Sequence, residues 1–230
     1  NSHFGEGDMT LALSSYRKAV DMAQDPFYTI WPKLYLSLCY FLNKELAKCE
    51  ESIEEVTAYA HRFGCEIFGP IIFPVVGVLL INKGRMSQGL KMIEETRISC
   101  IQKNWGFGTA FSELVLGILY FQIVCGGKQG NLSFLRNIGF LAKNIPFASK
   151  KAEHFLKKAI ESANRSGAKG LQGVSYMELS NLYKVRKKYS LAREYIDRAI
   201  HVFENIGAFV FIKSAERSME ELKQFSKNKK

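Results

Sequence analysis

The 230-residue chain is 47% apolar and 23% charged and has a formal net charge of +10, a composition typical of a folded globular protein and not of a disordered one. Its longest apolar run, Ile71 to Ile81, is too short to span a bilayer, and no signal peptide is recognisable. The five cysteines are scattered and form no C-x-x-C pair, which favours reduced thiols over a disulfide framework. We therefore expect a cytoplasmic protein that does not associate with a membrane.

The first recognisable element, Asp8 to Ala23, has the apolar spacing of a helix, with Ala12, Tyr16 and Ala19 on one face. This face has the character of the second helix of a pair, and the first helix that would cover it is missing. An uncovered apolar face of this kind indicates that the sequence is the carboxy-terminal part of a longer chain.

One pattern of bulky and small residues recurs three times further along the chain. The first-helix segments that share it are Phe73-x2-Val76-Gly77-x2-Leu80, Glu113-x2-Leu116-Gly117-x2-Tyr120 and Tyr176-x2-Leu179-Ser180-x2-Tyr183. Each is followed by a second-helix segment that begins with a small residue, and these are Gly89, Ala152 and Ala192. We expect the small residues to lie where the two helices of each pair cross, because a larger side chain there would hold the backbones apart.

Glycines are expected to end the second helices, because a residue without a Cβ adopts the left-handed conformation at no steric cost. The expected stops are Gly64, Gly106, Gly167 and Gly207, which give a period of about 40 residues with one interruption. The interruption is an insert at about residues 126–148 whose apolar spacing is broadly helical. We interpret it as a short helix packed back on the repeats. The alternative is an arm that docks on a partner or on a neighbouring subunit.

The best copy of the pattern, Tyr176 to Ala199, resembles one tetratricopeptide repeat, which is a pair of antiparallel helices. The resemblance implies an all-α, tetratricopeptide-like, right-handed α-solenoid of antiparallel helix pairs, with a period of about 40 and one helical insert. Residues 1–230 then form a single solenoid, and the increasingly polar stretch 208–225 is its capping helix. Such arrays bind other proteins, so the pattern indicates a class of function but not a ligand.

The positive charge is concentrated in the second half of the chain. Residues 1–127 contain 11 lysines and arginines against 13 acidic residues, whereas residues 128–230 contain 21 against 9. The densest basic cluster, formed by Lys184, Arg186, Lys187 and Lys188, falls in the turn predicted between two helices. It is either a solvated turn, where basic residues favour a helix C-terminus, or an interface for nucleic acid. No recognised nucleic-acid module accompanies it.

Catalytic chemistry finds little support in the sequence. The four histidines are far apart and form no metal-binding pair. The glycine-rich stretch 126–130 lacks the residue order of a phosphate-binding loop. We therefore expect a noncatalytic protein with no cofactor and no metal.

Two stretches, Ala148 to Gly170 and Ala192 to Ala208, resemble the carboxy-terminal helical repeats of large bacterial signalling proteins. Those proteins join a class III adenylate/guanylate cyclase or a protein kinase domain to a predicted ATPase module and then to tetratricopeptide repeats. Similar repeats terminate transcription activators of the maltose-regulator kind. The resemblance covers most of residues 65–210 and implies a regulatory module, with any cyclase, kinase or ATPase activity in the part upstream.

In tetratricopeptide arrays the first helices line a concave groove that holds a peptide or another domain. The groove positions in this repeat register are Val78, Ile81, Asn82, Leu114, Ile118, Phe121, Gln122, Met177, Asn181 and Lys184. Asn181 and Lys184 are placed to bind a backbone amide and a carboxylate of a protein partner or of an upstream domain. The alternative is that the groove residues pack against adjacent helices of a tightly wound solenoid.

Besides partner binding in the groove and nucleic-acid binding by the basic cluster, a third hypothesis for the function is self-association through the insert.

Overall fold

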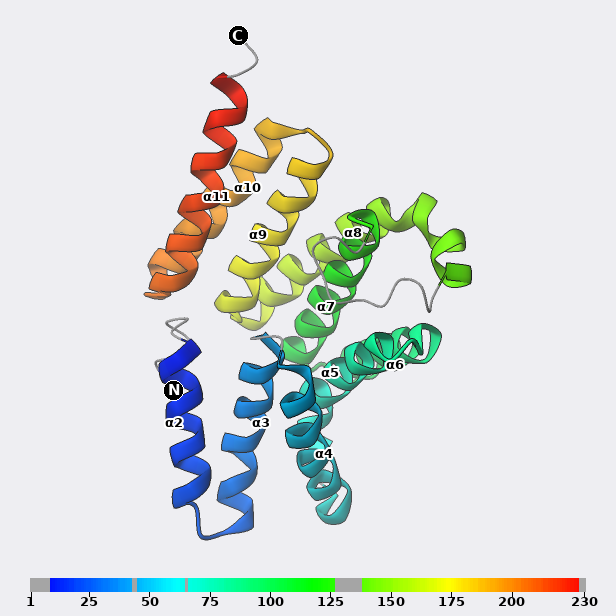
Figure 1. Ribbon diagram of the computed structural model, residues 1–230, viewed down its shortest axis with the longest axis vertical. Coiled ribbons are helices and arrows are strands. Elements are labelled where there is room, and N and C mark those ends of the chain that lie inside the picture. The colour runs from blue at the N-terminus through cyan, green and yellow to red at the C-terminus, as the bar shows by residue number, and fades with distance from the viewer. Residues whose placement is uncertain (1–8, 43–44, 65, 127–137, 228–230) are drawn as a thin grey trace.

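The computed structural model describes residues 9–42, 45–64, 66–126 and 138–227, and this part of the chain contains helices and no strand. The prediction of an all-α fold is confirmed for these residues (Figure 1). The helices are α2 (Met9–Met22), α3 (Pro26–Leu42), α4 (Leu46–Phe63), α5 (Gly69–Asn82), α6 (Met86–Gln102), α7 (Gly106–Val124), α8 (Ile138–Ser166), α9 (Lys169–Val185), α10 (Tyr189–Asn205) and α11 (Phe209–Lys227). A short 3-10 helix, η1 (Glu66–Phe68), leads into α5.

Consecutive helices pack against one another along an elongated molecule (Figure 1). Helices α2, α3 and α4 lie at one end, α9, α10 and α11 lie at the other, and α5 to α8 connect them. The most extensive contacts join α5 to α6, α7 to α8 and α9 to α10. These are the same pairs that the repeated sequence pattern predicts.

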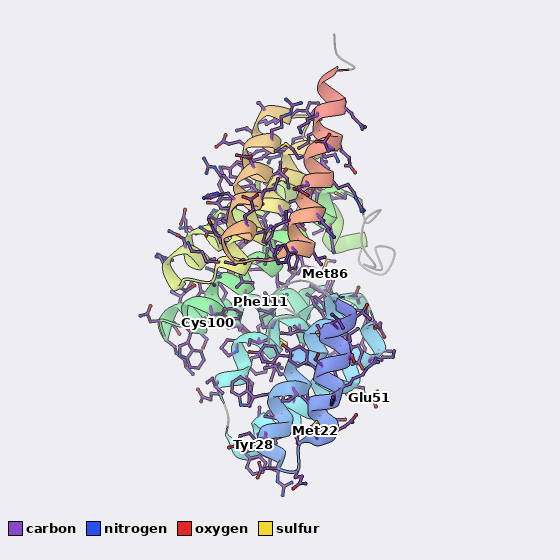
Figure 2. The ribbon with its side chains drawn as sticks, turned by 90° about the vertical axis from the view of Figure 1, so that its left-hand side faces the viewer. Met22, Tyr28, Glu51, Met86, Cys100 and Phe111 are labelled. Atoms are coloured by element: carbon purple, nitrogen blue, oxygen red, sulfur yellow. The ribbon has the colours of Figure 1, made fainter. Side chains whose placement is uncertain are left out.

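The core consists of two clusters of buried side chains that meet at α5. Val75 and Leu79 belong to the cluster shared with α2, α3 and α4, whereas Val78 and Ile81 belong to the cluster that continues to α11. Phe111 of α7, labelled midway along the molecule in Figure 2, packs against both clusters. Because neighbours cover α5 and α7 on more than one side, both helices are apolar around most of their circumference.

Helix α7 is also long and apolar enough to cross a membrane, and it is the one such helix in the described residues. Its most apolar stretch is 72% buried inside the protein. The core helix of a folded protein has the same length and composition, so this observation alone is weak evidence for a membrane span.

The small residues of the repeated pattern lie at helix crossings, as predicted. A Cβ added to Gly77 of α5 would lie 2.8 Å from the carbonyl oxygen of Gly89 in α6. A Cβ added to Gly117 of α7 would lie 2.7 Å from Cδ2 of Leu156 in α8. In the third pair, the Ser180 hydroxyl instead donates a 2.7 Å hydrogen bond to the carbonyl oxygen of Ala192. A larger residue at either of the first two crossings would overlap the partner helix, and at the third the serine hydroxyl bonds directly to the partner backbone.

One predicted helix stop is wrong. Gly106 does not end α6 but begins α7, and Asn104 takes the left-handed position with a φ of 56°. Asparagine tolerates this conformation better than most residues with a side chain. Gly106 is small for a different reason, since a Cβ there would lie 2.7 Å from Cβ of Ser166. The other three predicted glycine stops have positive φ angles.

The insert is described only in its later part. Residues 127–137 lie outside the described residues, so the interpretation of that stretch stays a prediction. From Ile138 onward the insert is continuous with the following second helix and forms the first turns of the 29-residue α8. In this part the chain lengthens a repeat helix and does not form a separate one.

Candidate functional site

The groove positions predicted on α5 and α7 are mostly core positions. Val78, Ile81, Leu114 and Phe121 are buried and belong to the cluster that continues to α11. These four side chains pack between helices, which corrects the prediction that they face a ligand. Asn82, Ile118 and Gln122 are half-buried beside that core and line neither of the cavities described below. The reason is geometric: α5 and α7 are covered on both sides, so their apolar residues face neighbouring helices.

The groove positions on α9 have a different environment, because they border a cavity. A cavity of about 200 Å³ lies between α9 and α11. Its lining residues are Met177 and Asn181 from α9 and Ser214, Arg217, Ser218 and Glu221 from α11. We call this cavity the α9–α11 groove. Figure 1 shows that both helices run in the same direction, with α10 connecting them.

Lys184 of α9 forms an ion pair with Glu221, which lines the α9–α11 groove. This pair uses the cation that was predicted to bind a partner's carboxylate, so Lys184 has an internal role. Arg217 is exposed, and no residue of the described ranges forms an ion pair with it. Asn181 on α9 and Arg217 on α11 lie on opposite walls of the same groove. Arg217 is therefore the cation that is available to a ligand there.

A half-buried carboxyl group lies on α9 beside the groove. Burial raises the pKa of Glu178, and a hydrogen bond with the Asn181 side chain opposes that rise. Asn181, Ser214, Arg217 and Ser218 line one small space, and each of these side chains carries hydrogen-bond donors.

The basic cluster at the turn between α9 and α10 is partly used inside the protein. Arg186 forms an ion pair with Glu153 of α8, and its Nε donates a 2.6 Å hydrogen bond to the Ser149 hydroxyl. Lys187 occupies the left-handed position that ends α9, with a φ of 59°. Lys187 and Lys188 are exposed and form no ion pair with any described residue. Two of the four predicted cations thus anchor helices, and two remain at the surface.

Sequence reasoning missed the α11 wall of the groove. Ser214, Arg217, Ser218 and Glu221 follow the i, i+3, i+4, i+7 spacing of one helix face. The increasingly polar composition of this segment predicts a solvated capping helix, and the spacing alone does not reveal that this face forms one wall of a groove. Within the described ranges there is also no group of three or more histidine, cysteine or acidic side chains that could hold a metal ion.

Comparison with known proteins gives no independent assignment. No protein-family model matches the chain, and no curated protein is significantly similar to it.

Proposed function

We propose that this chain is a tetratricopeptide-like solenoid that serves as a noncatalytic protein–protein interaction module, with the α9–α11 groove as its binding site. The observation that carries the proposal is the convergence of Asn181 and the unpaired Arg217 on one cavity from two parallel helices. Paired helices with small residues at each crossing support the tetratricopeptide-like architecture. In such arrays the first helices of successive repeats face the ligand, and on this proposal α9 and α11 are two such helices.

The chemistry of the groove suits a short peptide segment that carries an acidic group. Arg217 supplies a planar guanidinium that binds a carboxylate through two hydrogen bonds. The hydroxyls of Ser214 and Ser218 and the amide of Asn181 are matched to the polar groups of a peptide backbone. A volume of about 200 Å³ accommodates one side chain and a short stretch of backbone, so the rest of a partner lies on the surrounding surface. In a bacterial signalling protein of the kind the sequence resembles, an upstream domain is one such partner.

Replacing Asn181 and Arg217 together with alanine is expected to weaken peptide binding at least tenfold, because both walls of the groove lose their donors. Peptides selected by display against the wild-type protein serve as the probe, and fluorescence anisotropy measures their affinity. We expect the selected peptides to share an acidic residue. Lys213→Ala is the matched control, because Lys213 is an exposed neighbour on α11 that does not line the groove. Equal affinity for the double variant and the wild type contradicts the proposed site.

A second candidate function, nucleic-acid binding, is favoured by the exposed lysines at the turn between α9 and α10. Arg186 contacts Ser149, so the start of the well-packed part of α8 lies against this turn and brings Lys150 near it. Lys150, Lys187 and Lys188 are exposed and form no ion pair within the described residues. Three uncompensated cations attract the phosphate backbone of a nucleic acid without reading its sequence.

The variant Lys187→Glu, Lys188→Glu is expected to reduce affinity for a short DNA duplex about tenfold if this surface binds nucleic acid. The dependence of log affinity on log salt concentration should also become shallower by about two, one for each phosphate that a lysine no longer neutralises. Fluorescence anisotropy over a series of salt concentrations measures both quantities. Lys213→Glu, Arg217→Glu changes the net charge by the same amount on a different helix, so an equal loss in this control would assign the effect to net charge alone.

A further inference from the structure

A cleft of about 630 Å³ that the proposed function does not use lies beside α5. Its walls come from α4 and α6, which diverge in Figure 1, and its floor is the beginning of α5. Side chains of Ala60, Pro70, Ile72, Phe73, Met92, Cys100 and Trp105 give it a mostly apolar lining. Figure 2 places Cys100 near the middle of the molecule's length. We call this space the α4–α6 cleft. Small-molecule sites in proteins commonly have volumes of about 300–1,000 Å³ and a similar lining.

Comparison of the three helix pairs shows which group the cleft lacks. The helix crossings align Gly89 of α6 with Ala152 of α8 and Ala192 of α10. Three residues after each of these positions, α8 carries Phe155 and α10 carries Tyr195, whereas α6 carries Met92.

In the later pairs that residue stacks on an aromatic ring of its partner helix. The rings of Phe155 and Tyr120 are stacked with centroids 5.8 Å apart. The ring of Tyr195 lies 5.4 Å from that of Tyr183 and 6.1 Å from that of Tyr176. Each of these pairs therefore stacks aromatic rings across the contact between its two helices, an arrangement that stabilises the pair beyond the burial of area.

The pair formed by α5 and α6 has only one of these rings. Phe73 occupies the position of Tyr176, but Met92 replaces the ring that covers Tyr176 in the third pair. As a result the Phe73 side chain is 43% exposed, and both Phe73 and Met92 line the cleft. Trp105 supplies a further ring to the same space. The cleft lining thus contains two aromatic side chains from different segments, and α6 supplies no ring corresponding to Phe155 and Tyr195.

Charged groups at the rim are compensated in pairs. Lys103 forms a 2.5 Å ion pair with Glu66 and also lies over the Trp105 ring, with Nζ 4.9 Å from its centroid. Glu95 faces Lys91 at 3.7 Å. Because these pairs leave little net charge around an apolar lining, an uncharged occupant fits the rim better than an ion.

We propose that the α4–α6 cleft is a binding site for a small, uncharged, flat aromatic molecule, whose ring packs between Phe73 and Met92 as Tyr195 packs against Tyr176. The ligand replaces a ring that this helix pair does not supply itself. It also links α4 to α6, which otherwise diverge, so occupancy joins the α2–α4 end of the protein more firmly to the remainder.

The test uses N-phenyl-1-naphthylamine, a neutral aromatic probe whose fluorescence increases in apolar surroundings. The Trp31→Phe background leaves Trp105 as the single tryptophan, so energy transfer from tryptophan to the probe reports proximity to the cleft. We expect saturable binding of one probe per chain, with quenching of Trp105 emission. Saturation without quenching of Trp105, or no saturation, overturns the proposal.

Met92→Phe inserts the ring that α8 and α10 carry and is expected to weaken probe binding at least tenfold, because the new ring occupies the place proposed for the ligand ring beside Phe73. Ile98→Phe adds the same ring at an exposed α6 residue that does not line the cleft, and it should leave binding unchanged. Phe73→Ala provides a second test that does not add volume, and we expect it to weaken binding about fivefold by removing the ring on the cleft wall. Thermal unfolding of each variant establishes that it is folded. Equal affinity of wild type, Met92→Phe and Phe73→Ala would place the probe elsewhere and overturn the proposal.

Discussion

Gly89→Ala is expected to lower the free energy of unfolding by about 3 kcal/mol, because the crossing of α5 and α6 has no space for a methyl group. A Cβ at position 89 would overlap the carbonyl oxygen of Gly77 and lie 2.6 Å from Cγ1 of Ile81. The carbonyl oxygen of Gly77 belongs to the backbone, so the overlap can be relieved only if the two helices move apart. Alanine has a higher helix propensity than glycine by about 1 kcal/mol, but this gain is smaller than the cost of separating packed helices. Urea unfolding followed by circular dichroism measures the difference.

Gly170→Ala is the matched control for this prediction. Gly170 lies near the start of α9, and a Cβ added there meets no atom within 4 Å. The same chemical change should therefore be neutral or stabilise the protein by up to about 1 kcal/mol, since alanine restricts the unfolded chain. A Gly89→Ala protein as stable as the wild type would show that α5 and α6 do not cross as closely as described.

The crossings could be predicted because each depends on residues that are close in the sequence. Gly77 and Gly89 are twelve residues apart, as are Ser180 and Ala192, and this spacing recurs with the helix pair itself. The local pattern therefore shows both why a small residue is needed at the crossing and which residue of the partner helix it meets. The fold class follows from such short-range patterns, and it is the part of the structure that the sequence predicted best.

Positions of the groove residues could not be predicted in the same way. An apolar side chain such as Leu114 fits a ligand groove and a helix interface equally well, and only the number of neighbours around α7 decides between them. The structure covers α7 on more than one side, so Leu114 belongs to the core. On α9, by contrast, Met177 and Asn181 border open space because α11 stands across a cavity from them.

Charge pairs between distant residues were also invisible in the sequence. The ion pairs of Lys184 with Glu221 and of Arg186 with Glu153 join residues more than thirty positions apart. Sequence patterns report charges on one helix face but not which helix lies opposite. This is why Lys184 and Arg186, which stand out as basic residues in the sequence, turn out to hold helices together.

Glu153→Gln is expected to destabilise the protein by about 2 kcal/mol at pH 7 and to have almost no effect near pH 2. Burial works to raise the pKa of Glu153, but hydrogen bonds from Lys157, Arg186 and Tyr183 outweigh it and lower the pKa to about 2. The Lys157 and Tyr183 hydrogen bonds measure 2.7 and 2.8 Å. A pKa lowered from the ordinary 4.5 to about 2 corresponds to about 3.4 kcal/mol. Because the side chain is 26% exposed, solvent screening reduces this to about 2 kcal/mol.

The direction of the pH dependence follows from the lowered pKa of the folded state. The stabilisation by Glu153 is complete above the ordinary carboxyl pKa of about 4.5 and is lost as the pH falls from there through about 2. The difference in unfolding free energy between wild type and Glu153→Gln should therefore shrink across that interval, as measured by urea unfolding at a series of pH values. Glu161→Gln is the control, because Glu161 is exposed and pairs only with Lys158 three residues before it on the same helix. We expect that variant to differ from wild type by less than about 0.5 kcal/mol at every pH. A difference for Glu153→Gln that stays constant from pH 7 to pH 2 would show that the side chain stabilises α8 and α9 by packing, without its charge.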